Sequence, residues 1–192
     1  ELFENMGYTH IYAPDMERDY SSPLLDSVLM DSLVKLNKGL PLDAIIEAIN
    51  KLRNFDTGSQ LQKNMQFMDY LQNGIQVRYF VKGEERTSIV YLADYNNVAN
   101  NSFYVVNQFT YIENGNNRRP DIILFINGLP LVHVELKRRG VAIREAFNQI
   151  NRYQRDSFWA ASGLYQFVQI FVISNGTNTK YYSNTTRFNH IK

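Results

Sequence analysis

The spacing of the apolar residues changes at Gly74, and this change restricts the possible folds more than any other feature of the sequence. Before it, apolar residues recur at helical spacing; after it, they alternate with polar residues, and β-branched and aromatic residues predominate. We therefore expect residues 1–73 to be mostly helical and residues 74–192 to form a mixed β-sheet core flanked by helices, an α/β (α+β) fold. Because 192 residues suffice for one full core, residues 1–192 are predicted to form one domain.

Helices are predicted over residues 23–36, 41–52, 59–71 and 141–156. Gly39 and Pro41 separate the first two, and Ser59 is the expected N-cap of the third. The residues predicted to face inward are Leu25, Val28, Leu29, Leu33 and Leu36 in the first helix, Leu42, Ile45, Ile46, Ile49 and Leu52 in the second, Leu61, Met65, Met68 and Leu71 in the third, and Ile143, Phe147 and Ile150 in the fourth.

The predicted strands share an enrichment in β-branched and aromatic residues. They lie on either side of the polar segment 82–87, over residues 103–112, in a hairpin over residues 120–137 with Asn127-Gly128 as its turn, and over residues 167–174 and 179–184. Together they are expected to build the mixed sheet, with the helix over residues 141–156 as its principal crossover.

The charges are unevenly distributed, although the net charge is only +1. Residues 1–60 hold ten acids and five bases, whereas residues 61–192 hold nine acids and fifteen bases. Eight of those bases fall within residues 118–155, against three acids, and this local basic footprint suits contact with phosphate groups. For any single arginine among them, a solvated surface position is the simpler interpretation.

The composition also bears on where the protein works. The chain has no cysteine, no apolar run long enough to cross a bilayer and no signal-like segment after Glu1. A cytoplasmic protein without membrane contact is therefore expected.

Charged side chains interrupt the otherwise apolar hairpin, and strand alternation predicts where they lie. Alternate residues of the second strand point to opposite faces, so its polar set lies on one face and its apolar set on the other. The polar set is His133, Glu135 and Lys137, and the apolar set, which is expected to be the buried face, is Val132, Val134 and Leu136. Asp121 begins the first strand, at the end far from the turn, where Glu135 also lies.

The register of the hairpin decides whether Asp121 and Glu135 meet. A regular two-residue turn at Asn127-Gly128 would pair Asp121 with Val134, on the wrong face. We predict a shift of one residue, through a three-residue loop or a bulge, that pairs Asp121 with Glu135. Two adjacent carboxylates raise one another's pKa unless a cation lies between them, and Mg²⁺ is the cation expected to bind their oxygens.

Pro120-Asp121 followed by Glu135-Leu136-Lys137 resembles the PD-(D/E)XK nuclease signature. The longer segment "RRPDIILFINGLPLVHVELK", with "FYVVNQFTYI" before it and "AFNQINRYQRD" after it, resembles the N-terminal nuclease domain of the R (motor) subunit of type I restriction enzymes. "LVKLNKGLPLDAIIEAINKL" is similar to the helical segment that precedes the core in that family, so the resemblance covers nearly the whole chain. It implies a restriction-endonuclease-like core.

The resemblance also implies roles for individual residues. Asp121 and Glu135 would ligate Mg²⁺ with the main-chain carbonyl of Leu136, and Lys137 would orient the attacking water. Gln149 and Tyr153 match the family's Q-X-X-X-Y motif and share one helix face; from the sequence alone, capping the core edge explains this pair about as well. The residues expected to contact DNA or support the site are Gln149, Tyr153, Arg138, Arg139 and Arg144.

The function implied is Mg²⁺-dependent cleavage of both DNA strands, in a complex with methyltransferase and specificity subunits. The sequence contains no G-X-X-X-X-G-K-[ST] phosphate loop, so it is interpreted as a fragment whose ATP-driven motor lies beyond Lys192. Two alternatives stay open: another restriction or repair nuclease of the same fold, and a non-catalytic DNA-binding or subunit-docking module.

Two further questions stay open at this level. His133 stands where the family usually has an aliphatic residue, and a partly exposed packing histidine is expected rather than a metal ligand. A further acidic ligand on an early helix is a common feature of the superfamily, and Glu1, Glu4 and Glu47 are all candidates.

Overall fold

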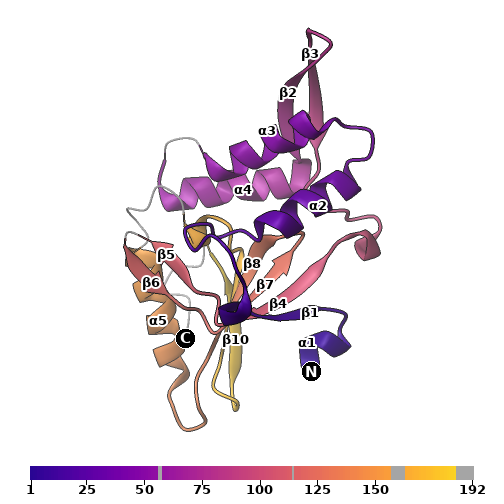
Figure 1. Ribbon diagram of the computed structural model, residues 1–192. Coiled ribbons are helices and arrows are strands. Elements are labelled where there is room, and N and C mark those ends of the chain that lie inside the picture. The colour runs from indigo at the N-terminus through magenta and orange to yellow at the C-terminus, as the bar shows by residue number, and fades with distance from the viewer. Residues whose placement is uncertain (56–57, 114, 157–162, 185–192) are drawn as a thin grey trace.

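The computed structural model describes residues 1–55, 58–113, 115–156 and 163–184. Its centre is a six-stranded mixed sheet with the strand order β1-β4-β7-β8-β9-β10 (Figure 1). Two neighbouring pairs, β1–β4 and β8–β9, are parallel, and the others are antiparallel. The strands are β1 (Thr9–Tyr12), β4 (Phe103–Asn107), β7 (Ile122–Ile126), β8 (Leu129–Leu136), β9 (Ile170–Ser174) and β10 (Thr179–Ser183). The predicted α/β class is confirmed.

The four predicted helices are present, each within three residues of its expected bounds. The α-helices of the described chain are α1 (Leu2–Asn5), α2 (Asp26–Leu36), α3 (Leu42–Arg53), α4 (Gln60–Asn73) and α5 (Ile143–Asp156), and its short 3-10 turns include η1 (Ala13–Asp15), η2 (Val98–Asn100) and η4 (Leu164–Gln166). Ser59 caps α4 as predicted, because its hydroxyl accepts the N–H of Gln62 and the Gln62 side chain accepts the N–H of Ser59.

Four further strands form two ribbons separate from the main sheet. β2 (Ile75–Val81) pairs with β3 (Glu84–Val90) in a ribbon that projects from the helical end of the molecule (Figure 1), and β5 (Tyr111–Glu113) pairs with β6 (Asn116–Arg118). The prediction that all strands join one sheet is therefore wrong for these pairs. The expected helical part also contributes a strand, since β1 pairs with β4. Alternation identifies strands, but only long-range pairing decides which sheet they enter.

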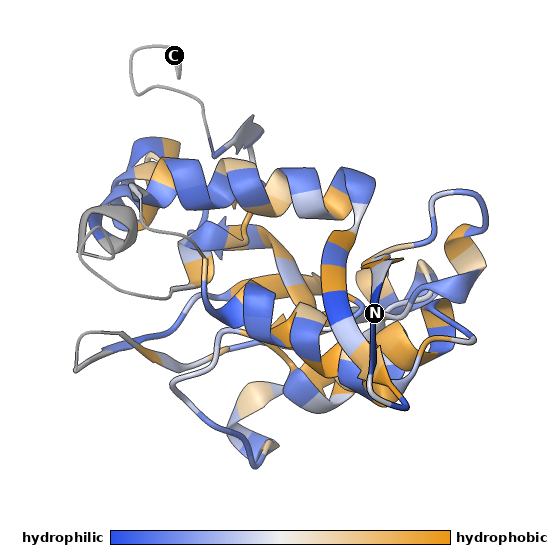
Figure 2. Ribbon diagram, turned by 90° about the horizontal axis from the view of Figure 1, so that it is seen from above, coloured by the Kyte–Doolittle hydropathy of each residue, from blue (hydrophilic) through white to orange (hydrophobic). Residues whose placement is uncertain are grey.

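Two groups of buried residues make up the interior. The helical core lies among α2, α3, α4 and the β2–β3 ribbon, with Leu33, Leu52 and Phe67 fully buried in it. The sheet core lies between α5, η4 and one face of the main sheet, with Phe125, Ile150 and Phe171 at or near zero exposure. Figure 2 shows orange, hydrophobic segments along the central strands and blue segments on the outer sides of the helices.

The inward face of α4 differs from the prediction. Leu61, Met65 and Met68 are 47%, 52% and 42% exposed, whereas Asn64 and Phe67 are buried. Phe67 packs edge-on against Phe167 of the helical core, at 5.0 Å between ring centroids. The Asn64 amide donates to backbone carbonyls at the end of η4 and just after it. Burial of an aromatic ring together with a satisfied amide outweighs burial of the more flexible methionines.

The apolar stripe of α3 is also narrower than predicted. Leu42 and Ile46 are 55% and 39% exposed, while Ile45, Ile49 and Leu52 are buried as expected. Two alanines, which the spacing of large apolar residues did not single out, complete the buried face of this helix.

The turn of the β7–β8 hairpin is a buried junction between sheet and helices. Asn127 and Gly128 both have positive φ, 52° and 82°, as expected for a two-residue hairpin turn. A Cβ on Gly128 would lie 2.6 Å from the backbone nitrogen of Leu29, and the carbonyl of Gly128 accepts the N–H of Leu25 at the start of α2. Only glycine permits this contact, so the turn holds the helical part against the sheet.

Candidate active site

A β-bulge shifts the register of the β7–β8 hairpin by one residue. Phe125 pairs with Pro130, but Leu124 pairs with Val132, so Leu131 is the extra residue. The turn itself keeps its two-residue form, and the pairing changes only beyond the bulge. This is the shift that the sequence predicts.

The bulge places Asp121 and Glu135 at the same end of the hairpin. Ile122 pairs with Val134, and Asp121, one residue before Ile122, therefore stands opposite Glu135. The Asp121 carboxylate accepts the N–H of Leu136 across 2.8 Å, and its main-chain carbonyl accepts the N–H of Gln108 across 3.0 Å. Both ends of the residue are thus anchored.

Burial raises the pKa of the Asp121 carboxyl, and the nearby charge of Glu135 raises it further. The hydrogen bond from the Leu136 N–H, together with the charge of Lys137, opposes this shift. The pKa of Asp121 is raised on balance, so the protein only partly compensates the negative charge of this carboxylate. A cation at this position would supply the missing compensation.

Glu135, Lys137 and Gln149 form a connected group beside Asp121. The Glu135 side chain is fully buried, and the Lys137 side chain is 21% exposed. The Lys137 ammonium donates to Oε1 of Glu135 across 3.1 Å and to Oε1 of Gln149 across 2.5 Å. Gln149 lies on α5, so the crossover helix helps to hold the lysine side chain in place.

The exposure of the two β8 faces differs from the prediction, although Val134 is buried as expected, with 7% of its surface exposed. Beneath α5 and η4, His133 and Glu135 have no exposed surface, whereas Leu136 on the expected buried face is 44% exposed. The sequence-based expectation of a partly exposed His133 is also wrong, for the same reason. The sheet core closes over the polar face because α5 crosses on that side, and strand alternation alone does not indicate on which face a helix will pack.

A tyrosine that the sequence did not single out completes the polar group. Nε2 of His133 lies 3.2 Å from Oε2 of Glu135, and the hydroxyl of Tyr165 lies 3.3 Å from Nδ1 of His133. Tyr165 belongs to η4, 32 positions from His133. No local pattern connects residues so far apart in the sequence, and the contact arises only when η4 packs on the sheet.

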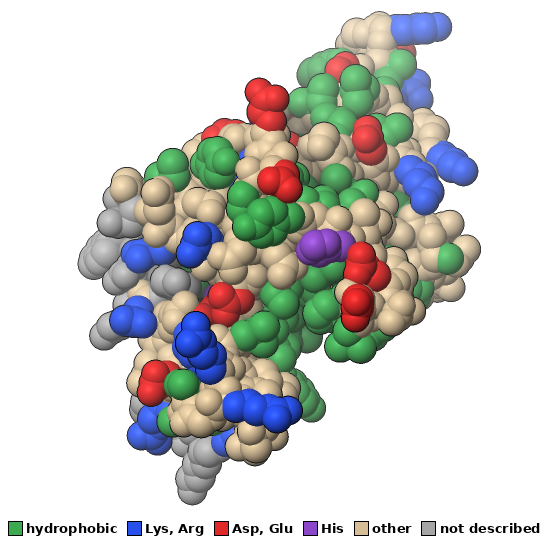
Figure 3. Space-filling model, turned by 60° about the horizontal axis from the view of Figure 1, so that its bottom comes forward, with side chains coloured by type: hydrophobic (Ala, Val, Ile, Leu, Met, Phe, Trp, Pro, Cys, Tyr) green, Lys and Arg blue, Asp and Glu red, His purple; other side chains and the backbone are tan. Residues whose placement is uncertain are grey.

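The remaining predicted residues have different outcomes. Arg138, Arg139 and Arg144 are exposed on the β8–α5 connection and the first turn of α5, and Figure 3 shows Lys and Arg side chains gathered in the lower left of that view. The side chain of Tyr153 lies outside the described residues. These three arginines of the basic footprint are therefore at the surface, close in the chain to the end of β8.

An open hollow of about 640 Å³ lies between the end of β8 and α5. It is lined by Leu136, Lys137, Arg138, Val141, Glu145, Asn148, Gln149 and Arg152. The hollow exposes the lysine of the connected group to solvent and has arginines on its rim. A phosphate group entering it would meet positive charge first.

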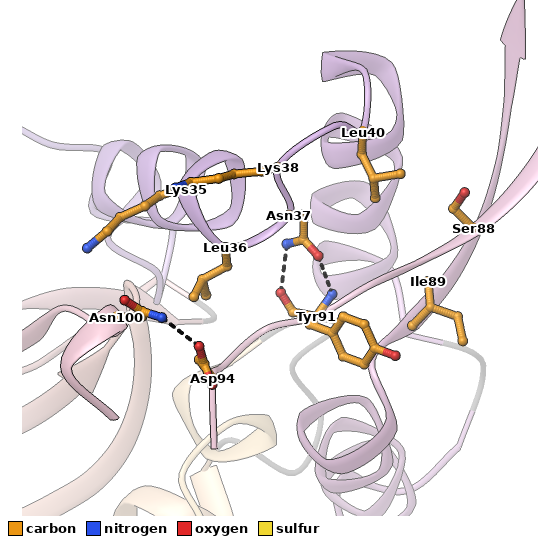
Figure 4. Close-up of a pocket in the computed structure, with 10 residues that line it drawn as sticks. All are labelled: Lys35, Leu36, Asn37, Lys38, Leu40, Ser88, Ile89, Tyr91, Asp94 and Asn100. Atoms are coloured by element: carbon orange, nitrogen blue, oxygen red, sulfur yellow. Dashed lines mark hydrogen bonds between the residues drawn. The ribbon is translucent and has the colours of Figure 1, made fainter. Parts of the chain in front are cut away.

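A second cavity of about 660 Å³ lies elsewhere, between the end of α2 and the end of β3 (Figure 4). In it the Asn37 side chain accepts the N–H and donates to the carbonyl of Tyr91, and Asn100 donates to Asp94. These groups satisfy one another. Volume does not distinguish the two cavities, so the chemistry of the hairpin residues identifies the candidate site.

The oxygen atoms at the end of the hairpin far from the turn are suitable ligands for a hard divalent cation. Asp121 and Glu135 supply carboxylate oxygens, and Leu136, which follows Glu135 in the chain and donates its N–H to Asp121, supplies a main-chain carbonyl. Across the described parts of the chain, no group of three or more His, Cys, Asp or Glu side chains is placed to hold a metal ion. None of Glu1, Glu4 and Glu47 thus joins the pair. Two carboxylates with water and a phosphate are a usual set for Mg²⁺.

Comparisons with known proteins place the chain among sequence relatives of one kind. Residues 1–190 match the family described as "Type I restriction enzyme R protein N terminus". The type I restriction enzyme EcoprrI endonuclease subunit of Escherichia coli is 40% identical over 77% of this chain. The putative MjaIXP endonuclease subunit of Methanocaldococcus jannaschii is 31% identical over 97%, and the HindI endonuclease subunit of Haemophilus influenzae is 31% identical over 92%.

The chain spans only part of each of these relatives. It covers 40% of the Escherichia coli protein, 18% of the Methanocaldococcus jannaschii protein and 17% of the Haemophilus influenzae protein. In the part of this chain that the structure describes, no helix has the length and apolar character needed to cross a membrane.

Proposed function

Because this chain belongs to the family of N-terminal domains of type I restriction enzyme R proteins, we propose that it is a Mg²⁺-dependent endonuclease domain that cuts both strands of DNA. The observation that carries the proposal is the bulged hairpin, which sets Asp121 opposite Glu135 beside Lys137. The proposal includes the fold: a restriction-endonuclease-like core, with the β7–β8 hairpin and α5 as its catalytic elements.

Asp121, Glu135 and the carbonyl of Leu136 hold the metal ion in this proposal. The ion supplies Lewis acidity at a phosphate oxygen and lowers the pKa of a water molecule. The raised pKa of Asp121 supports the assignment, because a carboxylate that gains little compensation from the protein gains most from a cation. Glu135 contributes a buried oxygen whose position is already set by hydrogen bonds.

Lys137 orients the attacking water and offsets charge on the scissile phosphate. Its ammonium group reaches solvent through the open hollow, yet two side-chain oxygens hold it in place. Preorganisation of this kind accelerates a reaction, because the donor need not reorient when charge develops in the transition state. Gln149 is the site-supporting residue that provides the second of these contacts.

Binding of DNA is proposed to rely on its backbone. Arg138 lines the hollow, Arg139 and Arg144 are exposed close to it in the chain, and contacts from arginine to phosphate carry no sequence information. Affinity should therefore fall steeply with salt and depend little on sequence. Replacement of one of these arginines by alanine should reduce the salt dependence by about one phosphate contact.

Partners and ATP belong to the same proposal. The relatives are named as endonuclease subunits of type I restriction enzymes, and we propose that this domain acts in such an assembly with methyltransferase and specificity subunits. ATP would serve a motor in the remainder of the longer chain.

The decisive experiment uses the full-length subunit assembled with those partners. Asp121→Ala and Lys137→Ala are expected to abolish DNA cleavage while DNA binding and ATP hydrolysis persist. Asp43→Ala and Lys38→Ala, which replace exposed residues of the helical part, are the matched controls and should cut normally. Unchanged cleavage in the first two variants would remove the nuclease assignment and favour a non-catalytic DNA-binding or docking module.

A further inference from the structure

A series of buried hydrogen bonds leads from Tyr165 through His133 to Glu135. None of the three side chains has exposed surface. The two oxygens of Glu135 are thereby divided between two donors, with Oε1 contacting Lys137 and Oε2 contacting His133. The way these donors are arranged bears on how Glu135 is presented to a metal ion.

The donors in this series all point toward the carboxylate. An ionised carboxylate only accepts hydrogen bonds, so Nε2 of His133 carries the hydrogen in its contact with Glu135. In a neutral imidazole the other ring nitrogen is then an acceptor, and the hydroxyl of Tyr165 donates to Nδ1. Tyr165 thereby selects the tautomer of His133 that can donate to Glu135.

Aromatic packing holds the imidazole of His133 in place. Pairing of β8 with β9 sets His133 beside Phe171, with 5.9 Å between ring centroids. The ring of Tyr165 stacks on Phe171 at 5.8 Å and lies 6.0 Å from His133. Since all three rings are fully buried, His133 cannot turn away from Glu135 without displacing its neighbours.

We propose that His133, oriented by Tyr165, is a positioning residue for the metal ligand Glu135. Its Nε2–H holds Oε2 on the buried side, so that the rotation of the carboxylate is set before the cation arrives. The inference rests on the proposed function, because it assigns His133 a role toward the same metal site. Partners that hydrogen-bond a ligating side chain typically change metal affinity by about 10–100-fold when they are removed.

Three substitutions of His133 separate positioning from packing. His133→Gln keeps an N–H donor close to the position of Nε2, His133→Asn keeps one near Nδ1 that is too short to reach Glu135, and His133→Leu keeps volume without a donor. Tyr165→Phe removes only the hydroxyl that selects the tautomer. If His133 positions Glu135, the Gln variant should bind Mg²⁺ more tightly than the Leu and Asn variants. If His133 only fills space, the Leu variant should bind Mg²⁺ at least as tightly as the Gln variant.

The measurement is Mg²⁺ affinity by isothermal titration calorimetry on the full-length chain without ATP. Asp121→Asn gives the background from any other Mg²⁺ site, and thermal unfolding in EDTA confirms that each variant is folded. We expect affinity within about threefold of the original for His133→Gln, a loss of about 10–100-fold for His133→Leu and His133→Asn, and a smaller loss for Tyr165→Phe. DNA cleavage should follow the same order.

The outcomes distinguish the two levels of the proposal. If the unmodified chain binds Mg²⁺ no better than Asp121→Asn, the metal site itself is wrong and the positioning role falls with it. If the unmodified chain binds Mg²⁺ and cuts DNA, but the Gln, Asn and Leu variants bind Mg²⁺ equally well, only the positioning role is wrong. Should His133→Leu fail to fold, the comparison of Gln with Asn still decides.

Discussion

The helical region and the region beneath α5 both bury polar side chains, but of different kinds. Around the helices the buried groups include the neutral amides of Asn37, Asn64 and Asn127, which donate to backbone carbonyls. Beneath α5 they include the ionisable His133 and Glu135, which contact each other, and Glu135 also accepts a hydrogen bond from the Lys137 side chain. An amide bound to backbone joins two segments at little cost, whereas a buried charge is expensive to desolvate. The second region therefore carries the marks of a functional site.

The largest expected effect tests the ionisable region. Glu135→Gln removes a carboxylate oxygen from the proposed metal site while keeping the shape of the side chain. DNA cleavage should fall by on the order of 10³-fold or more, because metal binding and charge stabilisation are both weakened. Glu85→Gln, on the exposed β2–β3 ribbon, is the control. Normal cleavage by the Glu135→Gln variant would show that the buried ionisable groups, like the buried amides, serve only the fold.

The helical core should respond in stability and not in chemistry. Leu33 has no exposed surface, so Leu33→Ala should lower the free energy of unfolding by about 2–5 kcal/mol, measured by denaturant titration. Its neighbour Val34 is 47% exposed, and Val34→Ala is expected to change stability far less. Mg²⁺ affinity of the folded Leu33 variant should be unchanged, and a large change would couple the two regions.

An amide junction should contribute stability alone. Asn127→Ala removes the side chain that donates to the carbonyl of Leu92 and accepts the N–H of Ser102. Buried groups left without a partner lower stability by on the order of 1–3 kcal/mol in such cases. Thermal unfolding measures this loss. Metal affinity lost in a variant that remains folded would show that the turn also acts on the site.

The charge of Asp121 should lower stability in the absence of metal. Its raised pKa means that the folded chain holds the proton more tightly than the unfolded chain, so the ionised form is disfavoured on folding at neutral pH. Asp121→Asn should therefore raise the unfolding temperature in EDTA. The advantage should shrink as the pH falls through the raised pKa toward the ordinary value of about 3.9. An advantage that does not change with pH would contradict this origin.

The smallest effect is expected on the outer face of α4. Met65 is 52% exposed, so Met65→Gln should change the free energy of unfolding by no more than about 0.5 kcal/mol. Phe67→Ala, on the buried face of the same helix, should lower it by about 3–5 kcal/mol. A comparable loss of unfolding free energy in the two variants would indicate that Met65 faces inward, as residue spacing predicts.

Local patterns in the sequence were sufficient for much of the structure. The spacing of apolar residues indicated the main helices and strands, and Asn127-Gly128 indicated the turn. The bulge was predictable because only a shifted register lets Asp121 and Glu135 share a face. The buried face of α4 was not predictable from spacing, since two stripes on that helix are apolar enough to pack and the position of Phe167 selects one.

By itself, the sequence determined the elements, the hairpin and the group formed by Asp121, Glu135 and Lys137, because each depends on residues close together in the chain. Tertiary structure alone decided that α5 covers the polar face of β8, and that η4 brings Tyr165 to His133. These contacts join segments that are far apart in the sequence, and they stabilise the protein only after the helix and the sheet have packed together. The environment that makes Glu135 a buried, doubly hydrogen-bonded carboxylate is therefore a property of the fold.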